Sequence, residues 1–118
     1  MVAFAEEQRV AVIPGALTPT EIMVALKAGV DFVKVFPCAQ LGGPSYIRAL
    51  KAPFPNAPLI ASGGVNQQNA GQFIGAGAAA LGIGEDLTPR QAVADRDREW
   101  IRELSRRFLN IVRRTRTK

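Results

Sequence analysis

The chain has 118 residues, of which 47% are hydrophobic and 21% charged, a balance that suits one modest folded domain and argues against disorder. No apolar run approaches the roughly 18 residues of a membrane span, and acidic residues near the N-terminus argue against a signal peptide, so we expect a cytoplasmic protein that binds no membrane. The absence of histidine and the presence of one cysteine, Cys38, argue against His-based catalytic triads, zinc sites and an internal disulfide.

Residues 2–8 read as the end of a helix, and after them short apolar runs alternate with helical stretches. The apolar runs predict strands at residues 9–14, 31–36, 58–61 and 79–83. The stretches between them predict helices at residues 18–27, 43–51 and 66–76. This alternation is typical of parallel βαβ units, whose strands are buried on both faces.

Two threonines are expected to begin helices. Thr18-Pro19-Thr20-Glu21 and Thr88-Pro89-Arg90-Gln91 both fit the capping box, with threonine at the N-cap and proline at the first helical position. We therefore interpret Glu21 and Gln91 as caps, not as catalytic groups.

Lys34 lies in the middle of an apolar predicted strand, where a charged side chain is unusual and requires an explanation. Side chains alternate along a strand, so Phe32, Lys34 and Phe36 share one face. Burial between two rings favours the neutral amine, which can attack a carbonyl as a Schiff-base nucleophile. The alternative is an edge-strand lysine whose stem covers apolar surface while its head reaches water.

Glycine-bearing turns follow three of the predicted strands: Pro14-Gly15, Ser62-Gly63-Gly64 and Gly82-Ile83-Gly84. In parallel αβ folds ligands bind at the carboxyl ends of the strands, and a phosphate commonly rests on N–H groups of the last loops. The glycines of residues 62–66 allow a close approach of the backbone to an anion. The alternative is that these turns only connect elements.

The net charge of +5 arises entirely in residues 95–118, which carry nine basic and four acidic side chains against six and six in residues 1–94. Apolar residues recur there at helical spacing and predict an amphipathic helix. We interpret its basic face as solvated, not as a nucleic-acid site. The apolar residues are Trp100, Ile101, Leu104, Phe108, Ile111 and Val112.

Four segments carry a resemblance: Val12-Ile13-Pro14-Gly15, Thr18-Pro19-Thr20-Glu21, Phe32-Val33-Lys34-Val35-Phe36-Pro37 and Ser62-Gly63-Gly64. In order and spacing, from the first residues to about Leu87, the chain resembles the second half of the 2-keto-3-deoxy-6-phosphogluconate (KDPG) and 2-keto-4-hydroxyglutarate (KHG) aldolases. The resemblance implies an α/β fold, the C-terminal half of a TIM (β/α)8 barrel with four βα units, in a family that is usually trimeric. Residues 1–94 would form the partial barrel domain, and residues 95–118 the helix packed on it.

The same resemblance implies roles for individual residues. Lys34 would form a Schiff base with pyruvate, and Phe36 would pack against the bound keto acid. Pro14 and Gly15 would line the site. The substrate phosphate would be held by Ser62, Gly63 and Gly64, with Gly84 in the last loop of the same site.

The chain also departs from the family pattern. A complete barrel has eight βα units, and the first four have no match here. In the family this first half carries the catalytic glutamate. It also carries the arginine and the threonine that bind the pyruvate carboxylate. Where relatives usually read Gly-Gly-Ser, this chain has Gly84-Glu85-Asp86. Two carboxylates would repel a phosphate. Either the substrate is not phosphorylated, or Glu85 and Asp86 turn away to cap the segment before Thr88.

The resemblance implies a class I aldolase that cleaves a 2-keto-4-hydroxy acid, such as KDPG or 4-hydroxy-2-oxoglutarate, to pyruvate and an aldehyde. It implies that the reaction needs neither a metal nor a cofactor. The substrate would be a small keto acid, either phosphorylated or unphosphorylated. The chain would form a homo-oligomer and would not bind nucleic acid. Without a general base the activity of the short chain would be impaired. The alternative is a non-catalytic half-barrel that binds a small anion or serves in assembly. A phosphosugar isomerase or epimerase would share the glycine loops, but it would need carboxylate or histidine acid/base groups at the strand ends, and the sequence has none there.

Overall fold

The computed structural model describes all residues, 1–118, as one four-stranded parallel sheet with helices along one side. The strands follow the chain order β1-β2-β3-β4. They are β1 (Gly15–Ala16), β2 (Val33–Val35), β3 (Leu59–Ser62) and β4 (Ala80–Gly82). The helices are α1 (Val2–Glu7), α2 (Pro19–Lys27), η1 (Ala39–Leu41), α3 (Pro44–Lys51), α4 (Ala70–Gly75), α5 (Arg90–Ala94) and α6 (Arg98–Arg116).

This architecture confirms the prediction of four βα units, the arrangement of a half-barrel. Lys34 pairs with Gly15 on one side and with Ile60 on the other, and Ile60 pairs with Ala80. Parallel strands that follow chain order curve in one direction when each is joined to the next by a helix. The two edges of the sheet, at β1 and β4, have no neighbouring strand in the chain.

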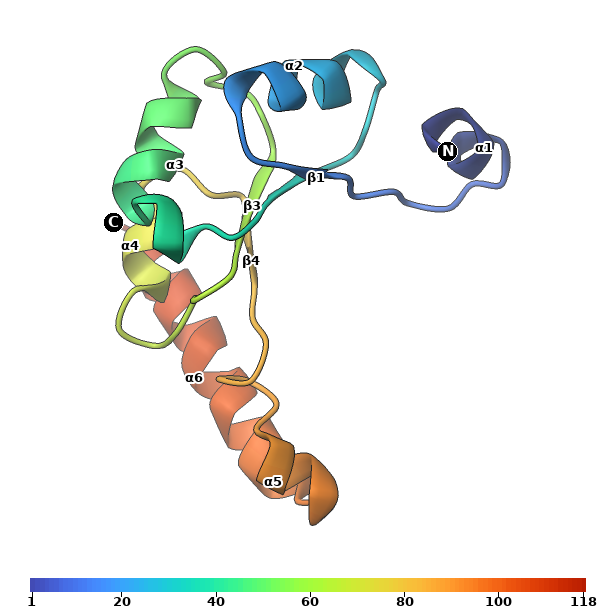
Figure 1. Cartoon of the computed structure of the whole chain (residues 1–118). Coiled ribbons are helices and arrows are strands. Elements are labelled where there is room, and N and C mark those ends of the chain that lie inside the picture. Colours follow the sequence, from blue (N-terminus) through green and yellow to red (C-terminus); the bar gives the residue numbers. More distant parts are fainter.

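The core lies between the sheet and the helices. Alternate strand residues, among them Val33, Val35, Leu59 and Ala61, are buried on the helix side, as expected from the alternation of side chains along a strand. On the other side Figure 1 shows no covering element. The largest fully buried side chain is Phe73 of α4.

The first strand is shorter than predicted and lies later in the chain. Residues 10–14 are extended but form no strand, and only Gly15 and Ala16 pair with β2. β2 itself spans three residues, which limits the pairing available to β1. Figure 1 shows α1 held away from the body on this extended segment, and none of its residues is buried.

One predicted capping box is confirmed and the other is wrong. The Thr18 side chain accepts from the Glu21 backbone N–H, and the Glu21 carboxylate accepts from the Thr18 N–H. Thr88 instead donates its hydroxyl to the carbonyl of Gly84 at 3.2 Å, and the Gln91 amide donates to Asp95. The turn at Gly84 engages Thr88, so α5 begins after Pro89 without a side-chain cap.

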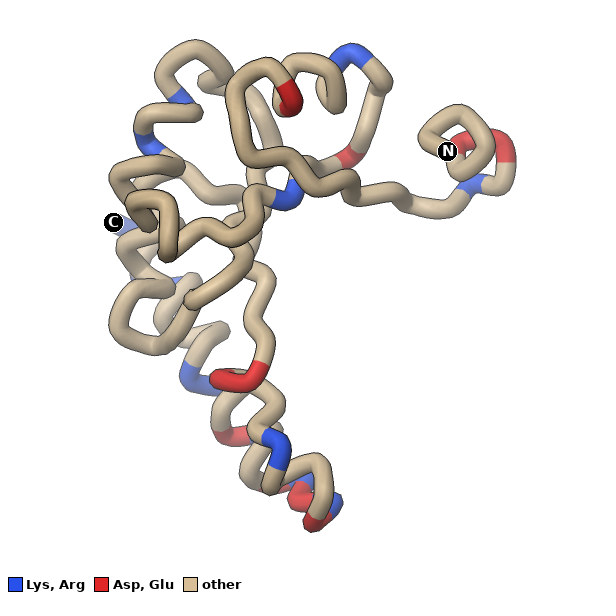
Figure 2. Tube along the Cα trace, in the orientation of Figure 1, with Lys and Arg blue, Asp and Glu red and all other residues tan.

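Helix α6 packs against α4 and carries the predicted amphipathic pattern. Leu104 and Phe108 are buried, whereas Trp100 is 42% exposed because the first turn of α6 extends beyond the body. A β-carbon on Gly71 of α4 would lie 3.1 Å from Thr115 Oγ1, so glycine allows the close approach of the two helices. Figure 2 shows charged residues crowded along α5 and α6.

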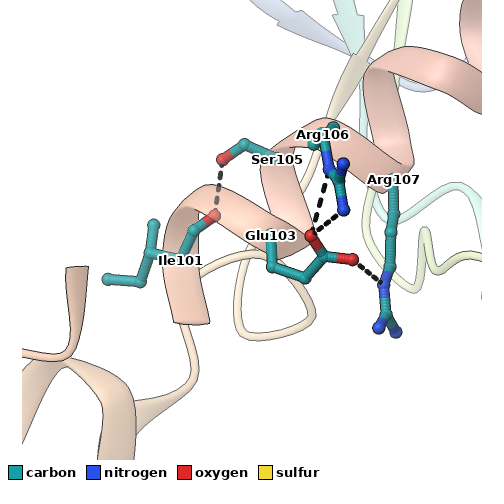
Figure 3. A network of polar contacts seen from close by, with 5 residues as sticks. All are labelled: Ile101, Glu103, Ser105, Arg106 and Arg107. Carbon is teal, nitrogen blue, oxygen red and sulfur yellow. Dashed lines mark hydrogen bonds and ion pairs between the residues drawn. The ribbon is translucent and has the colours of Figure 1, made fainter. Parts of the chain in front are cut away.

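The solvated face of α6 is organised by ion pairs one turn apart. Figure 3 shows the Glu103 carboxylate between Arg106 and Arg107. Hydrogen bonds from these two arginines, chiefly the one from Arg107, hold the pKa of Glu103 below its usual value. Such exposed pairs contribute little each. None of the helices is both long and apolar enough to cross a bilayer.

Candidate active site at the carboxyl ends of the strands

Lys34 stands at the centre of the uncovered face of the sheet. Its backbone N–H donates to the Pro14 carbonyl at 2.8 Å, and its side chain points away from the core, since Val33 and Val35 on either side are buried. The side chain is exposed, so the predicted burial of Lys34 is wrong for this chain. The reason is that no element covers the face that carries it.

Phe36 links Lys34 to the loop after β3. The Lys34 Nζ lies 5.3 Å from the centroid of the Phe36 ring, at a distance where an ammonium interacts with an aromatic face. The ring lies against Gly63: a β-carbon there would come within 3.0 Å of Phe36 Cδ2 and of Pro37 Cα. Gly63 also has φ +89°, a conformation that other residues rarely adopt.

A pocket of about 310 Å³ opens beside the Phe36 ring. It brings together five of the residues predicted for the substrate site, which come from the ends of β2, β3 and β4. These five are Phe36, Ser62, Gly63, Gly64 and Gly84. The pocket is completed by Val65, Gly82, Glu85 and Asp86.

Hydrogen bonds to its carbonyls hold the loop after β3 in place. The N–H groups of Cys38 and Ala39 donate to the carbonyls of Ser62 and Gly63 at 2.8 and 3.0 Å. The Asn69 amide donates to the Gly64 carbonyl at 2.9 Å. By contrast, the N–H groups of Gly63 and Gly64 have no acceptor in the chain.

α4 begins later than predicted, after a turn that Asn66 and Asn69 hold. The Asn66 side-chain oxygen accepts from the backbone N–H groups of Gln68 and Asn69, both at 3.0 Å, and the Asn69 side-chain oxygen accepts from the Asn66 N–H at 2.8 Å. The first N–H groups of a helix have no partner inside it, so these bonds cap the turn of residues 66–69. The helix starts at Ala70, so its N-terminus does not contribute to the pocket.

Glu85 and Asp86 line the pocket and do not cap the following segment. Figure 2 shows these acidic positions where the chain leaves β4, and no backbone N–H donates to either carboxylate. The nearest cation to Glu85 is Arg90, with 3.9 Å between Glu85 Oε1 and Arg90 Nε, and both side chains are largely in water. The sequence left open whether these carboxylates cap the chain or face the ligand, and the structure places them at the pocket.

Pro14 and Gly15 lie beside Lys34 but outside this pocket. The Pro14 carbonyl accepts from Lys34 and Gly15 is its partner on β1. Both residues also line a separate hollow of about 350 Å³ next to α2. Their role in substrate binding stays a prediction.

Gly82 is a pocket residue that the sequence reasoning did not assign. A β-carbon there would lie 2.7 Å from the Ser62 Oγ, so glycine is needed to admit the hydroxyl. The glycine-bearing turn Gly82-Ile83-Gly84 was the feature of the sequence that could have indicated a role for Gly82 in the pocket. No group of three or more His, Cys, Asp or Glu side chains is placed to hold a metal ion.

The parallel strands in chain order define this chain as a βα half-barrel, with a lysine next to a glycine-lined pocket at the carboxyl ends of the strands. The chain belongs to the KDPG and KHG aldolase family, whose model matches residues 1–104. Over 77 residues it is 47% identical to the 2-dehydro-3-deoxy-6-phosphogalactonate aldolase of Escherichia coli K12, covering 64% of this chain and 37% of that enzyme.

Solved structures agree with this assignment. The structure described as native KDPGal matches 99% of this chain with a TM-score of 0.86 and 34% identity, and the chain covers 55% of it. The KDPG aldolase of Legionella pneumophila, with pyruvate captured as a covalent carbinolamine intermediate, matches 87% of this chain with a TM-score of 0.78 and 27% identity, and half of its length is covered. The chain thus spans about half the length of such relatives.

Proposed function

We propose that the chain provides the Schiff-base half of an aldolase that cleaves 2-keto-4-hydroxy acids to pyruvate and an aldehyde. The observation that carries this proposal is the position of Lys34, whose Nζ lies on the open face of the sheet beside the ring that lines the pocket. The family membership of residues 1–104 supports it.

The reaction begins at the Nζ of Lys34. The neutral amine attacks the C2 ketone to form a carbinolamine, which loses water to give a protonated imine. The C3–C4 bond then breaks: its electron pair moves toward the imine nitrogen and forms an enamine, while the C4 hydroxyl loses its proton to a base and leaves as the aldehyde. Protonation of the enamine at C3 and hydrolysis release pyruvate and restore the amine.

The chain supplies the nucleophile but places no base next to it. The Nζ of Lys34 has no hydrogen-bond or ion-pair partner. A positioned general base typically contributes about 10² to 10⁴ in rate. We therefore expect the chain alone to form the imine and to turn over far more slowly than a complete barrel.

Trapping with pyruvate and borohydride tests the proposal. Reduction of the imine fixes the adduct, and peptide mapping by mass spectrometry should locate it at Lys34 and not at Lys27 or Lys51, which lie on α2 and α3. Lys34→Met should abolish the adduct, whereas Lys27→Met, at another exposed lysine, should retain it. The melting temperature of Lys34→Met should not fall below that of the parent chain, because the substitution replaces the amine by an apolar side chain of similar volume.

The second candidate function is a non-catalytic half-barrel that binds a small anion or serves in assembly. The exposure of Lys34 and the lack of a neighbouring base favour it. The trapping experiment separates the two functions. A chain that folds but forms no adduct at Lys34 would be the non-catalytic form.

A further inference from the structure

The pocket beside Phe36 has two chemically different sides. One side is the loop after β3, where the backbone N–H groups of Gly63 and Gly64 have no acceptor in the chain. The other side is the loop after β4, with Glu85 and Asp86. No lysine or arginine lines the pocket. Arg90, whose Nε lies 3.9 Å from Glu85 Oε1, stands outside the pocket, and both side chains of this pair are largely in water.

The donor side is fixed in position. Gly64 has φ +73°, and a β-carbon there would lie 2.5 Å from the β-carbon of Ala39, so only glycine fits. The Asn69 amide anchors the Gly64 carbonyl, and the Phe36 ring packs on Gly63. The loop is therefore held in one conformation, and its two unbonded N–H groups can donate to an oxygen atom of a ligand.

The acceptor side is held at the end of β4. The Gly84 carbonyl accepts from the N–H groups of Leu87 and Thr88, both at 3.0 Å, and from the Thr88 hydroxyl. These bonds close the turn that carries Glu85 and Asp86. The two carboxylates themselves accept no hydrogen bond from the chain, which leaves their oxygens available to a ligand.

We propose that this pocket selects an uncharged, hydroxylated tail of the 2-keto-4-hydroxy acid and disfavours a phosphate ester. This inference rests on the proposed function, because it places the keto group at Lys34 and the tail beyond Phe36. A hydroxyl group accepts from the N–H groups of the glycine loop and donates to a carboxylate at the same time. A phosphate ester, which carries a charge of about −1.5 to −2 at neutral pH, has only acceptors to offer and is repelled by both carboxylates.

Two substrates that differ only in the tail provide the test. The parent chain is incubated with 2-keto-3-deoxygluconate or with its 6-phosphate, and borohydride traps the imine at Lys34. The concentration that gives half-maximal adduct should be about tenfold lower for the unphosphorylated acid, the discrimination expected when a polar pocket is left mismatched. Higher ionic strength should narrow this difference, since salt screens the repulsion.

Removal of the two charges should abolish the preference. Glu85→Gln/Asp86→Asn keeps the shapes of the side chains and should lower the half-maximal concentration of the phosphate ester about tenfold relative to that of the unphosphorylated acid. The matched control is Glu6→Gln/Glu7→Gln, which removes the same charge from the exposed helix α1 and should leave the ratio unchanged. Equal or stronger trapping of the phosphate ester by the parent chain, or an equal shift in the control, would overturn the inference.

A second measurement follows ligand binding in the pocket without formation of the imine. In Lys34→Met, the NMR amide signals of Gly63 and Gly64 are followed during titration with each of the two acids. Shifts at lower concentration with the unphosphorylated acid support the inference, and shifts at lower concentration with the phosphate ester, or none with either acid, refute it. Failure of pyruvate to label Lys34 in the parent chain would instead refute the proposed function.

Discussion

Gly63 is the residue whose replacement tests the architecture of the pocket most directly. A β-carbon at this position would approach both the Phe36 ring and the Pro37 backbone at 3.0 Å, and its φ of +89° is strained for any other residue. We expect Gly63→Ala to lower the free energy of unfolding by about 1–3 kcal/mol, measured by urea denaturation.

Gly84 offers the matched control for this substitution. It lines the same pocket, but a β-carbon there would meet no atom within 4 Å. Gly84→Ala should therefore change stability by less than about 0.5 kcal/mol. A similar loss in both variants would show that the close packing of Gly63 against Phe36 does not matter to the fold.

Cys38 should be chemically inert in the folded chain. Burial raises the pKa of its thiol to about 11, so the reactive thiolate is scarce near neutral pH. Because the pKa is higher in the folded than in the unfolded chain, the contribution of this group to stability is present below about pH 8.5 and is lost as the pH rises toward 11. A thiol reagent at pH 8 should label Cys38 slowly in buffer and completely in urea; equally fast labelling in both would contradict its burial.

At the scale of elements, the two threonine-proline segments provide a paired experiment. Thr18 and Glu21 form the reciprocal capping box of α2, so Thr18→Ala should cost about 1 kcal/mol. Thr88→Ala should cost less, because the Thr88 side chain makes only one hydrogen bond, to an exposed carbonyl. The measurement is urea denaturation of both variants, and a larger loss for Thr88→Ala would show that its turn, not the capping box, stabilises the chain.

The Thr18 contribution should also depend on pH. Hydrogen bonds from Thr18, and then from the Leu17 N–H, hold the pKa of the Glu21 carboxyl below its usual value. A lowered pKa in the folded chain means that the contribution is present above about pH 4.3, the value of the unfolded chain, and is lost as the pH falls further. The cost of Thr18→Ala should therefore shrink in acid.

The sequence predicted the order and type of the elements because their periodicity is local. It failed at two helix starts: residues 66–69 form a turn closed by the Asn66 side chain before α4, and the turn at Gly84 engages the Thr88 hydroxyl before α5. The convergence of Phe36, Ser62, Gly63, Gly64 and Gly84 was predictable, because carboxyl ends of parallel strands meet at one edge. The exposure of Lys34 was not predictable from the sequence, because the exposure of this side chain depends on which elements cover the open face of the sheet.

At the scale of the whole molecule, the open sheet leaves apolar surface in water. Figure 1 shows the uncovered side between the N-terminal arm and the end of β4. Phe36 is 55% exposed and Ile13, just before β1, is 46% exposed. Unpaired edges at β1 and β4 add backbone donors and acceptors that another strand can pair with. Both features favour association.

We expect two copies to close an eight-stranded barrel, with β1 of each copy pairing with β4 of the other about a two-fold axis along the barrel. This arrangement pairs all four free edges, covers both open faces and surrounds Lys34 with protein. Sedimentation should then show a dimer whose dissociation depends on concentration.

A charge at the edge of the sheet should disrupt this dimer. Ile13→Lys places an ammonium beside β1, where closure would bury it, and should shift sedimentation toward the monomer or toward aggregates. Val93→Lys is the control, because Val93 is 56% exposed on α5, away from both edges, and should leave the dimer intact. A monodisperse monomer with a cooperative melt in the parent chain would refute the closed dimer, as would equal effects of the two substitutions.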